Sequence, residues 1–255
     1  MIGPMLLKAC LNGARLPREH PRLPVTARAL ASDVRAVVAA GAGAVHLHAK
    51  DADGADTLAA DVVARCVDAA RSAVPDVPVG VTTGAWAAPR VADRLSAIAG
   101  WQVLPDFASV NWHEAGADEI AALLLERGIG VEAGLWTAEA VQTWLGSPHR
   151  ERCLRTLLEL PDGLDRAATA AASGQLLGLV ADLSPPAAPV LLHGAGSSAW
   201  PALRLASTRG LDLRIGLEDV LVLPDGSPAA DNAALVHAAM ALVSADGVGT
   251  VDGRT

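Results

Sequence analysis

The sequence predicts an α/β protein built as a single (β/α)8 barrel. Three observations favour this fold: strand-like and helix-like segments alternate about eight times, the chain has 255 residues, and polar residues gather where the predicted strands end. Eight β/α units in about 250 residues is the usual size of one such barrel. No low-complexity linker divides the chain, so we expect residues 1–255 to form one domain.

Short apolar or β-branched runs mark the predicted strands. They cover residues 5–12, 44–50, 78–83, 107–112, 130–136, 152–159, 189–193 and 211–217. Ala- and Leu-rich segments with apolar residues spaced near 3.6 positions predict the helices between them. These cover residues 26–40, 57–73, 89–99, 117–127, 137–145, 164–183, 199–209 and 232–244. Gly41, Gly100, Gly128 and Gly210 stand where helix C-terminal caps are expected.

A doubly wound open sheet is the alternative fold. It would require a glycine-rich phosphate turn after the first strand. The sequence NGAR at residues 12–15 follows that strand instead, without the pattern G-x-G-x-x-G. The barrel is therefore the better prediction.

Composition limits the classes of function. Hydrophobic residues make up 51% and charged residues 19% of the chain, and no apolar run is long enough for a transmembrane helix. The first residues lack the pattern of a secretory signal. Three cysteines without a pairing pattern suit a reducing cytoplasm, and a net charge of −8 argues against nucleic acid as the main partner. We expect a cytoplasmic protein with no nucleic-acid or membrane partner.

The second predicted strand ends in His-x-His, which predicts a metal site. Because alternate side chains of a strand point the same way, His46 and His48 project together. A catalytic zinc site needs two imidazoles aimed at one point as its first two ligands. Glu218, which follows the last predicted strand, is the candidate third ligand. An acid at the start of a helix, favoured by the helix dipole, is the other explanation for Glu218.

Arg214 and Asp219 flank that glutamate. Arg214 shares strand parity with Glu218, so it should point into the barrel, where a buried guanidinium needs an anion. That anion is either Asp219 or a substrate. A purely structural pair between Arg214 and Asp219 remains an alternative.

Other polar residues close the remaining strands. They are Asn12, Thr82, Thr83, Ser109, Asn111, Glu132 and His193. Because catalytic groups of a parallel barrel lie at the C-terminal ends of its strands, we expect the chemistry at this end, with Thr82, Thr83, Ser109, Asn111 and Glu132 as substrate contacts. His193 precedes a glycine-rich turn that could admit a phosphate or a thioester, although a tight turn explains these glycines nearly as well.

Motifs spread along nearly the whole chain resemble the β-keto acid cleavage enzyme family, whose founding member cleaves 3-keto-5-aminohexanoate. The resemblance is carried by KACLNGAR (8–15), HPRLPVT (20–26), HLHAKD (46–51), GVTTGAW (80–86), EAGLW (132–136) and RIGLED (214–219). It implies a zinc-dependent (β/α)8 barrel, usually a homo-oligomer. The implied reaction converts a 3-oxo carboxylate and acetyl-CoA into acetoacetate and an acyl-CoA.

The resemblance also implies roles for individual residues. Its metal ligands match His46, His48 and Glu218, and its catalytic Arg and Asp match Arg214 and Asp219. A substrate-carboxylate contact matches Thr82, with Thr83 and Gly84 beside it.

Two residues depart from the family pattern. The member that takes an aminated substrate has Glu where this chain has Arg15, and an arginine cannot favour an ammonium group. An aminated hexanoate is therefore not the expected substrate, and an anionic or hydrogen-bonding tail is expected if Arg15 reaches the pocket. An apolar acyl chain, walled by Trp86, Trp112 and Trp136, remains the alternative. Lys50 replaces the usual Arg after the second histidine, which keeps the charge but loses the bidentate fork.

Two other classes of function remain open. Another metal-dependent barrel enzyme, a hydrolase or an aldolase, is the nearer one. Amidohydrolase-type barrels, however, carry His-x-His after the first strand and further histidines on later strands, whereas His46 and His48 end the second strand here. A non-catalytic barrel that binds a metal or a ligand is the other.

Overall fold

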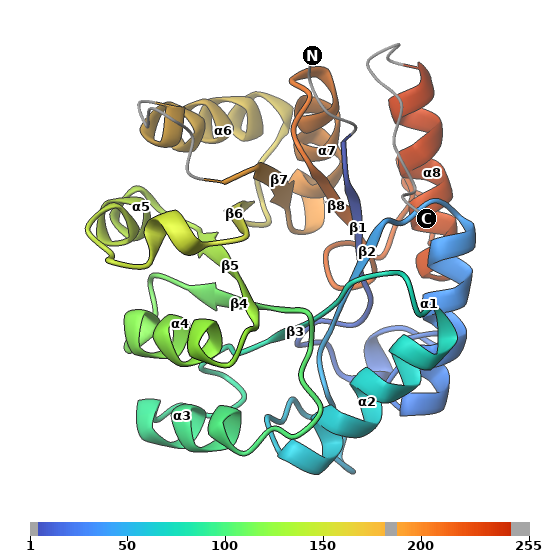
Figure 1. The fold of residues 1–255 in the computed structure, drawn as a ribbon. Coiled ribbons are helices and arrows are strands. Elements are labelled where there is room, and N and C mark those ends of the chain that lie inside the picture. The colour runs from blue at the N-terminus through green and yellow to red at the C-terminus, as the bar shows by residue number, and fades with distance from the viewer. Residues whose placement is uncertain (1–4, 182–187, 246–255) are drawn as a thin grey trace.

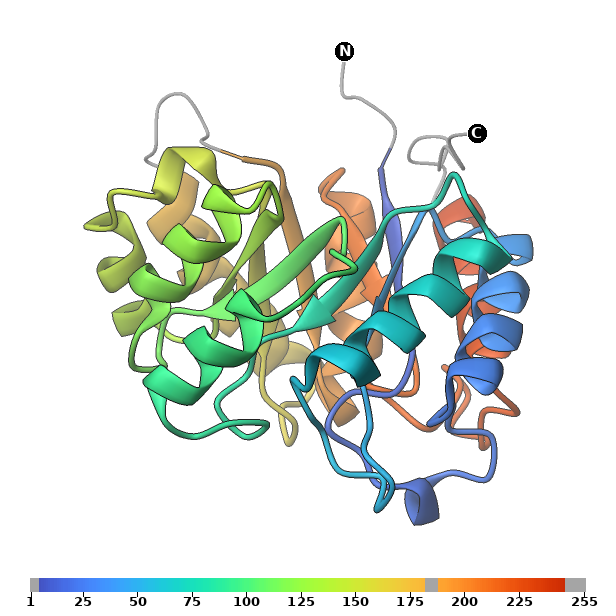
Figure 2. The same cartoon turned by 60° about the horizontal axis from the view of Figure 1, so that its bottom comes forward.

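The computed structural model describes residues 5–181 and 188–245 and confirms the (β/α)8 barrel. Eight parallel strands form one sheet in the order β7-β6-β5-β4-β3-β2-β1-β8. Figure 1 shows the strands ringed by helices, and Figure 2 shows the same arrangement from another side. The strands are β1 (Leu7–Cys10), β2 (Ala44–Leu47), β3 (Val79–Thr82), β4 (Phe107–Asn111), β5 (Gly130–Leu135), β6 (Arg155–Leu160), β7 (Val190–Gly194) and β8 (Leu213–Ile215).

One helix follows each strand, as the alternating pattern predicts. The helices are α1 (Ala27–Ala39), α2 (Ala60–Ala73), α3 (Val91–Ala99), α4 (Ala117–Glu126), α5 (Ala138–Leu145), α6 (Arg166–Ala181), α7 (Ala199–Thr208) and α8 (Asn232–Ala245). Buried residues recur at helical spacing in these helices, and in α1 they are Leu30, Val34 and Val37, which lay an apolar stripe on the sheet. No helix in the described part of the chain is long and apolar enough to cross a bilayer.

The observed elements begin and end within a few residues of the predicted ones. Residues 182 and 183 of the predicted sixth helix lie outside the described residues. Gly41, Gly128 and Gly210 follow helices with positive φ, as expected of C-terminal caps. Gly100 differs, because its φ of −79° is helical and its N–H bonds back into α3 as an ordinary last turn does.

The barrel closes between β7 and β8 through a residue just before β8. Asp212 forms a parallel bridge with Leu191, its N–H donates to the Val190 carbonyl at 3.0 Å, and its carbonyl accepts from the Leu192 N–H at 3.2 Å. The Asp212 carboxylate also accepts from the Leu6 N–H at 2.9 Å, next to β1. This one residue therefore joins the first, seventh and eighth strands.

Charged side chains cross the barrel interior. Lys8 on β1 pairs with Glu132 on β5, and both side chains are fully buried. Arg155 donates to the other oxygen of Glu132 at 2.6 Å and to the Asp212 carboxylate at 2.9 Å. Buried charges persist only when they are paired. These ion pairs therefore fix the positions of β1, β5, β6 and the start of β8.

Asp33 on α1 predicts a pH-dependent stability. Its carboxylate accepts from the Asn232 side-chain amide at 2.7 Å, and burial raises its pKa from the ordinary value of 3.8 to about 7. The folded state therefore favours protonated Asp33, and this contribution to stability is complete below pH 3.8 and lost as the pH rises through 7. Because one pKa unit corresponds to about 1.4 kcal/mol, Asp33→Asn should raise the free energy of unfolding by about 4 kcal/mol relative to the parent at pH 8 and leave it unchanged at pH 3.5.

Chemical denaturation at both pH values measures this difference. Asp68→Asn is the matched control, because Asp68 is exposed on α2 and makes no side-chain hydrogen bond among the described residues. Equal stabilities of Asp33→Asn and the parent at pH 8 would contradict the prediction.

Candidate metal centre and neighbouring acid–base groups

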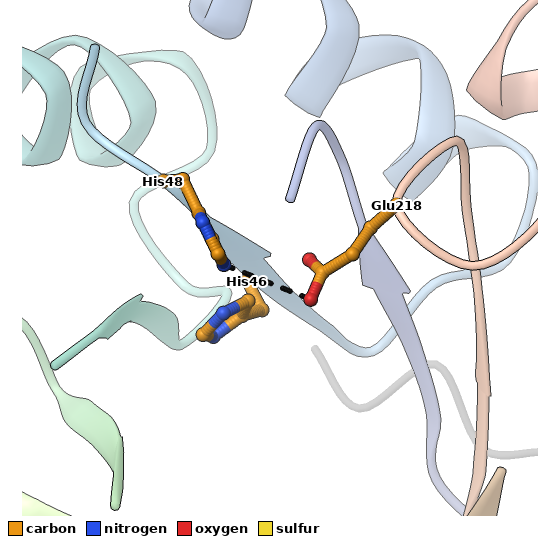
Figure 3. Close-up of side chains that lie close together, drawn as sticks. All are labelled: His46, His48 and Glu218. Atoms are coloured by element: carbon orange, nitrogen blue, oxygen red, sulfur yellow. Dashed lines mark ion pairs between the residues drawn. The ribbon is translucent and has the colours of Figure 1, made fainter. Parts of the chain in front are cut away.

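The C-terminal ends of β2 and β8 meet on either side of β1 and bring three candidate ligands together. Cys10 on β1 is opposite His46 on β2, and Lys8 is opposite Arg214 on β8. One ligand atom each from His46, His48 and Glu218 lies within 4.8 Å of the other two. Figure 3 shows His48 and Glu218 facing each other, with the His48 Nε2 atom 3.6 Å from Oε1 of Glu218. The predicted convergence of these residues is therefore present.

Two glycines leave room for the strand end that carries Glu218. Gly13 has a φ of +54°, and a Cβ there would come within 2.4 Å of the Glu218 Cγ. A Cβ on Gly216 would come within 1.9 Å of the Cys10 carbonyl oxygen. Buried Asn232 accepts from the Leu217 N–H at 2.6 Å and donates to the Leu11 carbonyl at 2.8 Å. The ends of β1 and β8 are thus held together beside Glu218.

Asp56 fixes the orientation of His48, a role that sequence reasoning missed. Its carboxylate lies 2.6 Å from the His48 Nδ1 atom, which leaves Nε2 to face Glu218. The same carboxylate accepts from the Lys50 ammonium and from the Trp86 indole N–H. Trp86 also stacks on His48, with ring centroids 6.0 Å apart. Asp56 lies in a polar loop after β2, and nothing in its sequence context marks it.

Lys50 has a structural place in this arrangement. Besides Asp56, its ammonium donates to the carbonyl oxygens of Gly13 at 2.6 Å and Arg15 at 3.0 Å. It therefore holds the loop after β1 against the loop after β2. Both of these loops border the candidate ligands.

The three residues fit a divalent metal. Among the described residues, Nδ1 of His46 and Oε2 of Glu218 are buried without a hydrogen-bond partner, which is costly unless a ligand satisfies them. Burial lowers the pKa of His46 to about 3, so its imidazole is neutral and has a lone pair to share. Burial opposes ionisation of Glu218, but Arg214, His48 and His46 lower its pKa well below the ordinary value. Burial opposes protonation of His48, but Glu218 and Asp56 raise its pKa to about 9, so a metal would displace a proton from this imidazole on binding. Two imidazole nitrogens and a carboxylate suit first-row divalent cations.

Arg214 and Asp219 form a buried pair next to these ligands. Nε and Nη2 of Arg214 donate to Oδ1 of Asp219 at 3.0 and 2.8 Å. Nη2 also donates to Oε1 of Glu218 at 2.6 Å. Burial raises the pKa of Asp219 despite the neighbouring Arg214, which makes this carboxylate a stronger base than an exposed aspartate.

His193 on β7 and Glu159 on β6 extend this polar region. They are opposite each other in the sheet, and Nε2 of His193 lies 3.5 Å from the Glu159 carboxylate. Nδ1 of His193 lies 3.8 Å from Asp219, and neither ring nitrogen makes a hydrogen bond to a described residue. Burial raises the pKa of Glu159 to about 8. Sequence reasoning omitted Glu159, although its position at the end of a predicted strand was an available signal.

Several predicted substrate residues hold the loops after β3 and β4. The Thr82 hydroxyl accepts from the Gly84 N–H at 3.0 Å, and the Thr83 hydroxyl donates to the Ser109 carbonyl at 2.7 Å. The Asn111 amide donates to Glu114 at 2.9 Å. Thr82 is opposite Ser109 in the sheet, so these two side chains share a face. Their contact with substrate stays a prediction.

Glu132 and Arg15 are in different surroundings. Both oxygens of Glu132 are engaged by Lys8 and Arg155, so this residue is already paired inside the barrel. Arg15 donates to the Leu217 carbonyl, next to Glu218, and pairs with Glu19 at 3.2 Å. Arg15 therefore lies at the rim of the candidate site, and Glu132 lies in the network below it. Their substrate contacts also stay predictions.

The environment of Asp56 predicts an effect on metal binding. Asp56→Ala should weaken the affinity for a divalent metal by roughly 10–100-fold, because His48 loses the acceptor that orients its ring. Competition with a chromogenic chelator measures this dissociation constant. Asp53→Ala is the matched control, since Asp53 is exposed in the same loop and its carboxylate makes no hydrogen bond to a described residue. An affinity within twofold of the parent would refute the role of Asp56.

The chain is similar to known proteins over nearly its whole length. A sequence profile of the beta-keto acid cleavage enzyme family matches residues 4–251. The 3-keto-5-aminohexanoate cleavage enzyme of Fusobacterium nucleatum is 24% identical, over 93% of this chain and 90% of that protein. The enzyme of the same name from Acetoanaerobium sticklandii is 23% identical, over 91% of this chain and 89% of that protein.

Solved structures of ObcA share the fold. Its binary complex with oxaloacetate has a TM-score of 0.71 at 17% identity, covering 91% of this chain and 66% of that chain. Its ternary complex with a C4-CoA adduct and oxalate has a TM-score of 0.72 at 19% identity, covering 90% of this chain and 65% of that chain. The chain thus spans less than two thirds of the length of these ObcA chains. On the family profile, which matches nearly the whole chain, the protein belongs to the beta-keto acid cleavage enzyme family.

Proposed function

We propose that this chain is a zinc-dependent acyltransferase that cleaves a 3-oxo carboxylate with acetyl-CoA, giving acetoacetate and the CoA thioester of the remaining acyl group. The observation that carries the proposal is the convergence of His46, His48 and Glu218 beside the Arg214–Asp219 pair. The ObcA structures with oxaloacetate and with a C4-CoA adduct support keto-acid and CoA substrates on this fold.

His46, His48 and Glu218 would hold the zinc ion. When bound, zinc supplies Lewis-acid stabilisation of the negative charge that develops on the substrate ketone. His48 keeps its orientation through Asp56, and Glu218 keeps its charge through Arg214. These contacts place the ligands before substrate arrives.

Asp219 acts as the general base. Its carboxylate takes a proton from the carbon between the ketone and the carboxylate, and Arg214 holds it in place. The carbanion then attacks the acetyl carbonyl and releases CoA thiolate. Attack of that thiolate on the original ketone breaks the carbon–carbon bond, and the proton held by Asp219 returns to acetoacetate. Atoms and charge balance over this sequence.

Thr82, Thr83 and Gly84, with Ser109, Asn111 and Glu132, are the proposed substrate contacts. Arg15 at the rim favours a 3-oxo acid with an anionic or hydrogen-bonding tail over an aminated one. We also propose that residues 1–255 form one catalytic domain, which works in the cytoplasm as a homo-oligomer.

A substrate screen tests the proposed function. 3-Oxo acids with anionic, apolar and cationic tails are incubated with acetyl-CoA, and acetoacetate release is followed. We expect turnover only with acetyl-CoA present and a preference for the anionic tail. Arg15→Glu should invert the preference between anionic and cationic tails by roughly tenfold or more, because one charge changes sign. An unchanged ranking would show that Arg15 does not face the tail.

The same assay separates the remaining alternatives. A hydrolase or aldolase would turn over a 3-oxo acid without any CoA compound. A non-catalytic metal-binding barrel would bind zinc and ligand without turnover. Either result would refute the proposed acyl transfer.

A further inference from the structure

The glycine-rich turn after β7 is occupied by a side chain of the protein itself. The Asp162 carboxylate accepts from the N–H groups of Ser197 at 2.8 Å and Gly163 at 2.7 Å. A Cβ on Gly196, whose φ is +54°, would come within 2.1 Å of the same carboxylate. An acidic group thus already uses the amide that a phosphate would need. Phosphate groups of a substrate therefore require another site.

A groove of about 400 Å³ lies between α6 and α7, close to this turn. Arg166 and Ala170 are four residues apart on α6, and Trp200 and Arg204 are four apart on α7, so each pair shares a helix face. Ala170 has a small side chain, which leaves the groove open on the α6 side. Pro224, from the loop after β8, forms part of the wall.

The two arginines of the groove have no anionic partner. Among the described residues, neither Arg166 nor Arg204 takes part in an ion pair or a side-chain hydrogen bond, and both are exposed. The adjoining surface is apolar, with Trp200, Leu205 and Pro224. Two guanidinium groups beside apolar side chains suit a ligand that combines phosphates with a flat ring.

The groove begins close to the proposed general base. The Gly196 N–H donates to the Asp219 carbonyl at 2.8 Å, and α7 starts three residues after Gly196. At helical rise, Trp200 lies roughly 6–8 Å along the chain axis from Gly196, and Arg204 lies about one turn farther. The Trp200 indole N–H donates to the Val222 carbonyl at 2.9 Å, in the loop that also carries Glu218. A long flexible arm could therefore run from Asp219 into the groove.

We propose that this groove binds the 3′-phospho-ADP part of CoA, with Arg166 and Arg204 on its phosphates and the apolar wall against its adenine. The proposal rests on the proposed function, which supplies acetyl-CoA as the co-substrate. The pantetheine arm then spans the distance between the groove and Asp219, and places the thioester beside the 3-oxo acid.

Two acetyl donors, one with the nucleotide and one without it, test this proposal. The double variant Arg166→Glu/Arg204→Glu should raise KM for acetyl-CoA roughly tenfold or more, because two attractive charges become repulsive. KM for acetyl-pantetheine, which lacks the nucleotide, should stay within twofold. Isothermal titration with acetyl-CoA, in the absence of a 3-oxo acid, should show the same loss of affinity.

Two further variants serve as controls. Arg35→Glu changes an exposed arginine on α1, which makes no ion pair with a described residue, and should leave both KM values unchanged. Arg18→Glu/Arg22→Glu makes the same change of charge at two exposed arginines between β1 and α1. A selective loss of acetyl-CoA affinity in that variant, and not in the groove variant, would overturn the proposal.

The outcomes distinguish the groove from the function. If the parent transfers acetyl groups and the groove variant keeps its KM and affinity for acetyl-CoA, the groove does not bind CoA, and the proposed acyl transfer is unaffected. If the parent shows no transfer but binds acetyl-CoA more tightly than the groove variant does, the groove is the CoA site and the proposed acyl transfer is wrong.

Discussion

His46→Ala and Glu218→Ala should each abolish metal binding and acyl transfer together. Each variant removes one of three ligands whose atoms lie within 4.8 Å of one another. A bound metal contributes several kcal/mol to stabilising charge in the transition state, so kcat/KM should fall on the order of 10³-fold or more. Elemental analysis of the purified protein measures zinc per chain, and acetoacetate release measures the activity.

A histidine outside the site provides the control. His237 is exposed on α8, and His237→Ala should keep full zinc content and activity. Circular dichroism confirms that each variant is folded. Turnover by a folded His46→Ala protein that carries no metal would end the proposal of a metal-dependent reaction.

Asp219→Asn should stop turnover while leaving the metal in place. The asparagine oxygen can still accept from Arg214, so the buried guanidinium keeps a partner, but the amide cannot take a proton. Loss of a general base lowers rates roughly 10²–10⁴-fold. Asp219→Asn should lose activity and keep zinc, whereas Glu218→Ala should lose both. Measuring zinc and activity together therefore separates the role of Asp219 from that of Glu218.

Exchange of the substrate α-proton in D2O, without acetyl-CoA, isolates the base step. The parent should exchange this proton, and Asp219→Asn should not, although both bind zinc. Glu159→Gln is a useful comparison, because it alters a nearby half-buried carboxyl on β6 that pairs with His193 and not with Asp219. Exchange at the parental rate in Asp219→Asn would assign the base to another group.

The fold could be predicted well because its signal repeats. Eight strand-like and eight helical segments each gave independent evidence, so small errors at the ends did not change the topology. The closing of the barrel could not be predicted, because it depends on Asp212, a residue at the start of a predicted strand whose carboxylate meets Leu6 and Arg155. Long-range contacts of this kind leave no local pattern.

The candidate site shows the same division. His46, His48 and Glu218 could be predicted to converge, because strand parity and the shared C-terminal edge of a barrel fix where their side chains lie. Asp56 could not, since a polar loop residue acquires its role only where the loop folds back on His48. Strand position alone also could not show that Glu132 forms ion pairs with Lys8 and Arg155 inside the barrel.

The candidate ligands come from the second strand and from the segment after the eighth, so a bound ion would act as a tether between distant parts of the polypeptide. An unfolded chain would rarely bring these parts together, because closing so long a loop costs conformational entropy. The ion would therefore bind the folded form almost alone, and its free concentration would raise the melting temperature. The free metal concentration would then set the thermal stability of the protein as well as its activity.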